Sequence, residues 1–188
     1  MKRIIICIIL FLFAINISAQ HMSFMGIPMG SHFNTFRKSL ESKGFKLSTD
    51  QMDNPNFYNY EGYFAGYKVG LVVSTTPTSK KVSDVWVIFS EFFHFKSGYN
   101  LKYGAGVSMD DVENLYLDLT DKLVSKYGLP KGYDENSKFL KNLFFQTDAG
   151  NIMLTEEFLE DINCVRLTLY YSDKLTKELG NQEKINDL

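Results

Sequence analysis

The chain contains two stretches in which apolar residues recur every three or four positions, the spacing of an amphipathic helix. The first stretch has Phe33, Phe36 and Leu40 on one face. Ser31 is a residue type favoured at helix N-caps, and glycine, here Gly44, is favoured just after a helix end. The pattern therefore predicts a first helix that begins at Ser31 and stops at Gly44.

The second stretch is longer and begins at Ser108. Asp110 and Asp111 occupy its first turn, where the helix dipole favours negative charge. Its apolar face carries four residues at helical spacing: Val112, Leu115, Leu119 and Leu123. Because Gly128 and Pro130 then interrupt the pattern, we predict a second helix that ends near Tyr127.

Each predicted helix is followed by three stretches with strand character. After the first helix these are Tyr58–Phe64, Tyr67–Thr75 and Val82–Phe89. After the second helix they are Leu143–Thr147, Ile152–Phe158 and Cys164–Tyr171. Short turns that contain glycine join the first two strands of each set, which predicts two hairpins. The order α-β-β-β thus occurs twice, over about residues 24–91 and 107–173, and we interpret it as an internal duplication.

Apolar and polar residues alternate along the predicted strands, as in an antiparallel sheet that helices cover on one face. The apolar sets of two strands are Tyr67, Val69, Leu71 and Val73, and Val165, Leu167, Leu169 and Tyr171. Val72 is an exception to the alternation in the first of these strands. The expected fold is a single α+β domain over residues 20–176. In it, two α-β-β-β units form an antiparallel sheet with helices packed on one face. We expect residues 92–107 to be a linker, and residues 177–188 to be a frayed polar C-terminal tail.

The N-terminus has the three parts of a secretory signal peptide. Lys2 and Arg3 precede an apolar run over Ile4–Ile15, and the small residue Ala19 precedes Gln20. A membrane-spanning helix needs about 20 apolar residues, and this run is shorter. We therefore predict cleavage between Ala19 and Gln20, a mature protein without a membrane span, and a periplasmic or secreted location.

Loss of the signal peptide changes both the charge and the cysteine content. The net charge of −2 becomes −4 when Lys2 and Arg3 leave, and a mildly acidic chain is not expected to bind nucleic acid. Cys7 also leaves, so Cys164 becomes the single cysteine and an intramolecular disulfide is impossible. We expect Cys164 to be an inert, buried thiol within a strand.

The polar residues do not form a recognisable catalytic or metal-binding motif. The three histidines of the mature chain, His21, His32 and His94, lack metal-ligand spacing. We expect His21 to be disordered, His32 to be exposed and His94 to lie in a packed aromatic segment. No nucleophile elbow and no phosphate-binding loop is present in the sequence. We therefore expect neither a metal nor a cofactor.

Carboxylates are the remaining candidates for catalysis, because a glycoside hydrolase needs only two. The acidic clusters are Asp110-Asp111-Glu113, Asp134-Glu135, Glu156-Glu157 and Glu160-Asp161. We interpret them as ordinary solvated surface. An unrecognised hydrolase stays an alternative, which would require two of these carboxylates to converge in a cleft.

Aromatic residues on the predicted strands are the most promising binding residues. The simpler interpretation is that most of them pack within the sheet. The functional interpretation is that Trp86, Arg166 and Tyr170 form a contact patch on the face away from the helices, since these residue types concentrate binding energy at protein interfaces. A protein partner is the first hypothesis, which would make the chain a non-enzymatic binding or adaptor protein. A carbohydrate- or envelope-binding module that uses the same aromatic face is the alternative.

Several short motifs resemble, in the same order, those of a group of small exported proteins from Bacteroides-type bacteria. They are Phe24-Met25-Gly26-Ile27-Pro28-Met29-Gly30, Lys43-Gly44-Phe45, Gly62-Tyr63-Phe64-Ala65-Gly66-Tyr67, Lys126-Tyr127-Gly128-Leu129-Pro130 and Leu169-Tyr170-Tyr171-Ser172-Asp173. This resemblance spans most of the mature chain and implies export without implying an activity. The order of two α-β-β-β units is also similar to the β-lactamase-inhibitor-protein fold and to small outer-membrane assembly lipoproteins. Both of these resemblances imply protein binding.

Overall fold

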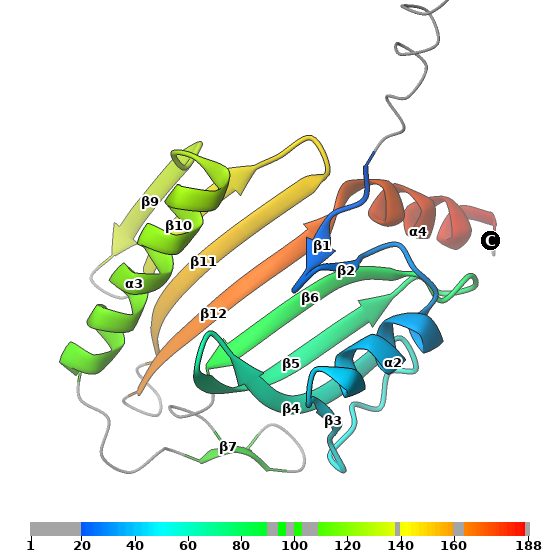
Figure 1. The fold of residues 1–188 in the computed structure, drawn as a ribbon, viewed down its shortest axis with the longest axis horizontal. Helices are drawn as coiled ribbons and strands as arrows, with labels where there is room; N and C mark the ends of the chain where they lie inside the picture. Colours follow the sequence, from blue (N-terminus) through cyan, green and yellow to red (C-terminus); the bar gives the residue numbers. More distant parts are fainter. Residues whose placement is uncertain are drawn as a thin grey trace, which may run out of the picture.

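The computed structural model describes residues 20–89, 94–96, 100–102, 109–137, 140–159 and 164–186. The predicted signal peptide up to Ala19 lies outside these ranges, as does the predicted helix start at Ser108. The chain forms an α+β fold in which one large antiparallel sheet is packed against helices, which confirms the predicted fold class (Figure 1).

The large sheet has eight strands in the order β3-β4-β5-β6-β12-β11-β10-β9, and all neighbours are antiparallel. The strands of the first half are β3 (Lys46–Leu47), β4 (Phe57–Phe64), β5 (Tyr67–Thr75) and β6 (Val82–Phe89). Those of the second half are β9 (Gly132–Ser137), β10 (Leu140–Gln146), β11 (Gly150–Leu159) and β12 (Cys164–Asp173). The last strands of the two halves, β6 and β12, pair at the centre, so the two predicted units share one continuous sheet. Each unit also gains an edge strand, β3 or β9, that the hydrophobic pattern did not predict.

Helix α2 (Phe33–Ser42) follows the predicted apolar pattern but begins one residue later than the predicted cap suggests. His32 is the N-cap, and its Nδ1 accepts a hydrogen bond from the backbone N–H of Asn34 at 3.2 Å. The Ser31 hydroxyl instead donates to the carbonyl oxygen of Pro28. At the other end Gly44 has φ +89°, a conformation that glycine adopts without strain, and the helix stops there as predicted.

Helix α3 (Met109–Tyr127) carries the predicted apolar stripe, and all four of its residues are buried. Figure 1 shows α2 and α3 on the same side of the sheet, α2 in front of the first half and α3 in front of the second. A small hairpin, β1 (Ser23–Phe24) and β2 (Ile27–Pro28), lies between them, and the buried Phe24 ring packs against Phe64 and Tyr171. We call this side of the sheet the core face.

The predicted apolar sets do face the core, but β5 is buried on its other face as well, at Gly70, Val72 and Ser74. On β5 and β12 the predicted apolar sets, apart from the half-buried Tyr67, are buried on the core face, together with Val85, Val87 and Phe89 of β6. The predicted linker contains a short hairpin of β7 (His94–Lys96) and β8 (Asn100–Lys102). The side chains of His94 and Cys164 lie outside the described residues, so their predicted surroundings remain predictions.

The C-terminal segment differs from the expectation of a frayed tail. Residues Lys174–Asn186 form helix α4, in which Thr176 and Gly180 are buried. Glu183 accepts hydrogen bonds from the backbone N–H groups of Thr78 and Ser79, in the turn between β5 and β6. The tail forms a helix because these contacts with distant residues hold it, although its composition is polar.

A buried carboxylate joins the start of α4 to the N-terminal segment. Asp173, whose side chain is 0% exposed, accepts hydrogen bonds from the backbone N–H and hydroxyl of Thr176 and from the backbone N–H of Met22. Nδ1 of His21 lies 3.0 Å from the same carboxylate. The expectation that His21 is disordered is therefore wrong. Its own side chain and the backbone N–H of Met22 both contact the buried carboxylate of Asp173.

Candidate functional site

The face of the sheet opposite α2 and α3, which we call the open face, carries a row of neutral side chains across its middle. Strand pairing places six residues side by side in this central row: Asn59, Val72, Trp86, Tyr170, Met153 and Phe144. Val72 is buried and the other five are half-buried. The predicted residues Trp86 and Tyr170 thus lie next to each other on the predicted face.

The two aromatic rings at the centre of this row pack against one another. The ring centroids of Trp86 and Tyr170 are 5.0 Å apart, and the ring planes are inclined by 32°. The pair is tilted rather than stacked, and its centroid distance lies within the roughly 4.5–7 Å usual for favourable aromatic pairs. Phe57 of β4 lies on the opposite side of Trp86 from Tyr170, and the centroids of the Phe57 and Trp86 rings are 6.1 Å apart. Each central ring therefore has at least one neighbouring aromatic ring packed against it.

Arg166, the third predicted site residue, lies on the same face but at a distance from the other two. It is four residues before Tyr170 on β12, a separation of about 13 Å along a strand. Its guanidinium forms an ion pair with Glu157, the residue directly opposite it on β11. The structure brings Trp86 and Tyr170 together and leaves Arg166 at the far end of the open face.

A polar network that the sequence did not reveal lies beside the central rings. The Tyr170 hydroxyl donates to Oδ1 of the buried Asp84 at 2.5 Å. Nζ of Lys177, on α4, donates to the Tyr170 hydroxyl at 2.8 Å and lies 3.3 Å from Asp84 Oδ1. The Ser172 hydroxyl lies 3.4 Å from the same Nζ. The available sequence signal for Asp84 is its position two residues before Trp86, which places both side chains on the same face of β6.

Burial and hydrogen bonding shift the acidity of this network. Burial, together with the hydrogen bond to the Asp84 carboxylate, raises the pKa of Tyr170 above its ordinary value near 10. Burial alone would lower the pKa of Lys177, but the hydrogen bond to Tyr170 and the charge of Asp84 outweigh it and raise that pKa. At neutral pH the network therefore contains a neutral phenol between an ammonium and a carboxylate.

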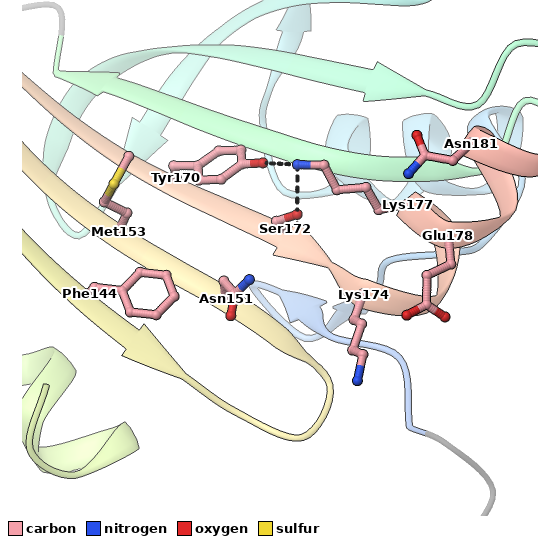
Figure 2. Close-up of a pocket in the computed structure, with 9 residues that line it drawn as sticks. All are labelled: Phe144, Asn151, Met153, Tyr170, Ser172, Lys174, Lys177, Glu178 and Asn181. Atoms are coloured by element: carbon pink, nitrogen blue, oxygen red, sulfur yellow. Dashed lines mark hydrogen bonds between the residues drawn. The ribbon is translucent and has the colours of Figure 1, made fainter. Parts of the chain in front are cut away.

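A pocket of about 300 Å³ opens where α4 meets the open face of β10, β11 and β12 (Figure 2). Phe144, Met153 and the Tyr170 ring form its apolar part. The polar part consists of six residues from the ends of β11 and β12 and from α4: Asn151, Ser172, Lys174, Lys177, Glu178 and Asn181. In Figure 2 the side chain of Lys177 extends from α4 over the sheet to the Tyr170 hydroxyl. The pocket is thus continuous with the central row.

Two of the acidic residues considered from the sequence do converge, on the core face. Glu113 of α3 and Glu156 of β11 both form ion pairs with Lys141 of β10, the second at 3.3 Å. Burial raises the pKa of Glu156, and the charge of Lys141 opposes this shift without cancelling it. The lysine lies between the two carboxylates, so this group is an ion cluster under α3. The side chains of the clusters at residues 134–135 and 160–161 lie outside the described residues.

Within the described ranges, no three His, Cys, Asp or Glu side chains are close enough together to hold a metal ion. In the same ranges, no helix has the length and apolar content needed to cross a bilayer. His32, expected to be exposed, is exposed and serves as the cap of α2.

Comparison with protein-family models, curated proteins and solved structures finds no match for this chain. The resemblances to exported proteins of Bacteroides-type bacteria and to the β-lactamase-inhibitor-protein fold therefore stay predictions.

Proposed function

We propose that this chain is an exported, non-enzymatic binding protein that contacts a protein partner through the open face of its sheet. One observation carries the proposal: a row of half-buried aromatic and apolar side chains, centred on Trp86 and Tyr170, on the face that α2 and α3 do not cover. Tryptophan and tyrosine are the residues whose truncation most often weakens protein complexes.

The charges of this face favour a protein interface. Arg166 is paired with Glu157, and Lys177 is paired with Asp84, so the central row lies between two neutralised pairs. The centres of protein interfaces are likewise depleted of unpaired charge, with polar groups at the rim. A partner can therefore cover the central row without burying an uncompensated charge.

The ring geometry favours a protein over a glycan as the partner. Sugars bind to aromatic side chains by stacking on a free ring face. The Trp86 and Tyr170 rings pack against one another with centroids 5.0 Å apart, and the Phe57 ring lies 6.1 Å from Trp86 on the side of β4. The rings therefore offer edges and partial faces, which suit the irregular side chains of a protein better than a flat sugar ring.

The ion cluster on the core face gives less support to the hydrolase alternative. A retaining or inverting glycosidase needs one carboxylic acid in its protonated form and one free carboxylate on either side of the substrate. Glu113 and Glu156 instead share the cation of Lys141. This arrangement fits a structural contact between α3 and the sheet.

A photo-crosslinking experiment in the cells that produce the protein tests this function. A benzophenone amino acid replaces Thr168, a half-buried residue of the open face that directly neighbours Ile88 across the strand pair. The matched control replaces Asp121, an exposed residue of α3. We expect a discrete protein adduct from position 168, weakened by Trp86→Ala, and none from position 121. Absence of an adduct at 168, or equal adducts at both positions, contradicts the proposal.

The same face can be tested for glycans with an intrinsic probe, because Trp86 is the only tryptophan of the chain. We expect its fluorescence to be unchanged by neutral oligosaccharides. A saturable change would replace the protein partner with a glycan.

A further inference from the structure

The pocket beside α4 has two kinds of polar group on its walls. Lys177 and Ser172 are already held in the network around Asp84 and Tyr170. The side chains of four other lining residues make no hydrogen bond or ion pair with any part of the chain that the structure describes: Asn151, Lys174, Glu178 and Asn181. The inner wall of the pocket is therefore fixed, and its rim offers unused donors and acceptors.

The apolar part of the pocket suits a single large aliphatic or aromatic group. Phe144, Met153 and the ring of Tyr170 come from three adjacent strands and lie at one end of the central row. Methionine is flexible and polarisable, so it adapts to apolar groups of different shape. A volume of about 300 Å³ lies at the lower limit of the roughly 300–1,000 Å³ usual for small-molecule pockets. One side chain with its flanking peptide groups matches this volume better than a large cofactor does.

The free groups of the rim match the chemistry of a peptide backbone. Each carboxamide, Asn151 on β11 and Asn181 on α4, has both a donor and an acceptor, as a peptide group has. The rim also carries one cation and one anion, Lys174 and Glu178, so it selects neither sign of charge. These properties favour a neutral, extended segment over an anionic ligand such as a phosphate.

We infer that this pocket receives one large apolar side chain, such as leucine or phenylalanine, from an extended segment of the protein partner. Asn151 and Asn181 then hydrogen-bond to the peptide groups on either side of that side chain. This inference rests on the proposed function, and it adds the position and the chemistry of the main anchoring contact. The rest of the segment lies along the central row toward Trp86.

Capped tripeptides test the inference without knowledge of the partner. N-acetylated and amidated Gly-X-Gly, with X as Leu, Phe, Ala or Asp, is titrated into the full folded protein up to about 20 mM, since one anchoring side chain supports affinity only in the millimolar range. NMR follows the methyl signal of Met153 and the side-chain amide signals of Asn151 and Asn181. We expect saturable shifts of these signals for Leu and Phe, and much smaller shifts for Ala and Asp.

Two single substitutions on α4 provide the matched comparison. Asn181→Ala removes a rim carboxamide and is expected to weaken binding of the Leu peptide about fivefold, the usual effect of one lost hydrogen bond. Gln182→Ala, at the exposed neighbouring position outside the pocket lining, is expected to leave binding unchanged. Equal effects of the two substitutions overturn the assigned role of Asn181.

Other ligand classes give results that overturn the inference. Shifts that are equal for all four peptides, or absent for all four, exclude a pocket for an apolar side chain. Binding of free leucine without binding of the capped Leu peptide assigns the pocket to a free amino acid. Shifts by neutral sugars assign it to a glycan.

The tripeptide titration and the crosslinking at position 168, taken together, separate this inference from the proposed function. If position 168 crosslinks to a protein but the tripeptides do not bind, the open face binds its partner without this pocket. If the Leu peptide binds but position 168 yields no adduct, the pocket is a peptide site and the wider interface is wrong.

Discussion

The two faces of the sheet are built from the same strands but differ in how far their side chains are removed from solvent. On β11, Leu154 is 0% exposed on the core face, whereas its neighbour Met153 is half-buried on the open face. On β6, Val87 and Trp86 show the same contrast. Helices α2 and α3 and the β1–β2 hairpin cover the first face, while α4 lies over one end of the second (Figure 1). The comparison separates residues that specify the fold from residues that are available for contact.

The faces also differ in their chemistry. The core face is mostly aliphatic and aromatic, and its charged groups include the cluster around Lys141 at the α3 end and the buried Asp173 at the end of β12. The open face combines aromatic rings with hydroxyl, amide and paired charged groups. A surface of the second kind costs less to expose in the free protein and still provides apolar area to a partner.

The largest expected effect comes from truncating neighbours on β11 that face opposite sides. Leu154→Ala is expected to lower the free energy of unfolding by about 4 kcal/mol, because it opens a cavity in a closely packed core. Met153→Ala is expected to cost about 1 kcal/mol, because the methionine is only half-buried. Urea unfolding followed by circular dichroism measures both. Similar losses for the two variants would show that the open face is as firmly packed as the core.

The second prediction concerns Asp173, the acid that connects elements on the two sides of the sheet. Asp173→Asn keeps the shape but presents an amide donor to the backbone N–H of Met22 or to Thr176, both of which already donate. We expect a loss of about 2.5 kcal/mol in the free energy of unfolding, since buried donors lose an acceptor. Hydrogen exchange should also become faster in both the β1–β2 hairpin and α4. Asp148→Asn, at an exposed position, is the control and should have no measurable effect.

Much of this fold follows from local pattern. The bounds of β5 and β6 and the residues of β5 that face the core follow from the two-residue repeat of a strand, whereas the burial of β5 on its other face does not. The two predicted units were correct in order because each helix and hairpin has its own local signals, such as Gly44 after α2 and the left-handed Ala65 and Gly66 of the β4–β5 turn.

The elements that the sequence did not predict depend on distant partners. Helix α4 is polar, and its hydrophobic pattern is weak; it is held by Glu183 at the β5–β6 turn and by Lys177 at Asp84. Strand β9 is an edge strand without a clear alternation, and its pairing with β10 defines it. Composition alone cannot show such contacts, because they join residues about 100 positions apart.

The candidate site was predictable only in part, because local pattern gives the face on which a side chain lies but not its neighbours on other strands. Strand parity places Trp86 and Tyr170 on the open face, but it does not give the register between β6 and β12 that makes them neighbours. Nor does it give the pairing of Arg166 with Glu157, which removes that arginine from the central group. Asp84 and Lys177 complete the network only after both the register and α4 are known.

The third prediction tests whether the open face contributes to stability through its polar network. Tyr170→Phe removes the hydroxyl between Lys177 and Asp84 and is expected to cost about 1 kcal/mol. Because the pKa of Tyr170 is raised in the fold, the neutral phenol stabilises the protein fully below its ordinary pKa near 10, and this contribution is lost as the pH rises above it. Unfolding midpoints of the wild type and the variant should therefore converge in alkaline solution.

The control for this experiment is Tyr63→Phe, at a 67% exposed position on β4. This substitution should leave the free energy of unfolding unchanged both at pH 7 and in alkaline solution. A variant Tyr170→Phe that is as stable as the wild type at pH 7 would show that α4 is held at the sheet without the network.

The smallest expected effect at neutral pH concerns a polar atom on the core face. Tyr60 is 1% exposed, its hydroxyl has no hydrogen-bond partner among the residues that the structure describes, and burial raises its pKa to about 12. Tyr60→Phe removes an unsatisfied group, so we expect the free energy of unfolding at pH 7 to stay the same or to rise by up to about 1 kcal/mol. The neutral phenol of Tyr60 favours the fold fully below pH 10, and this contribution is lost between pH 10 and about 12 as the unfolded chain ionises first.

The wild type should therefore lose stability over this alkaline range faster than Tyr60→Phe does, as urea unfolding at pH 7 and near pH 10.5 would measure. The two faces respond in opposite directions to the same change: loss of a tyrosine hydroxyl costs stability at Tyr170, where it is bonded, and does not at Tyr60, where it is not. A Tyr60→Phe variant that is destabilised by more than about 1 kcal/mol would mean that the hydroxyl has a partner in solution, such as a buried water. The core face would then contain a polar site of its own, and the contrast between the two faces would be one of degree.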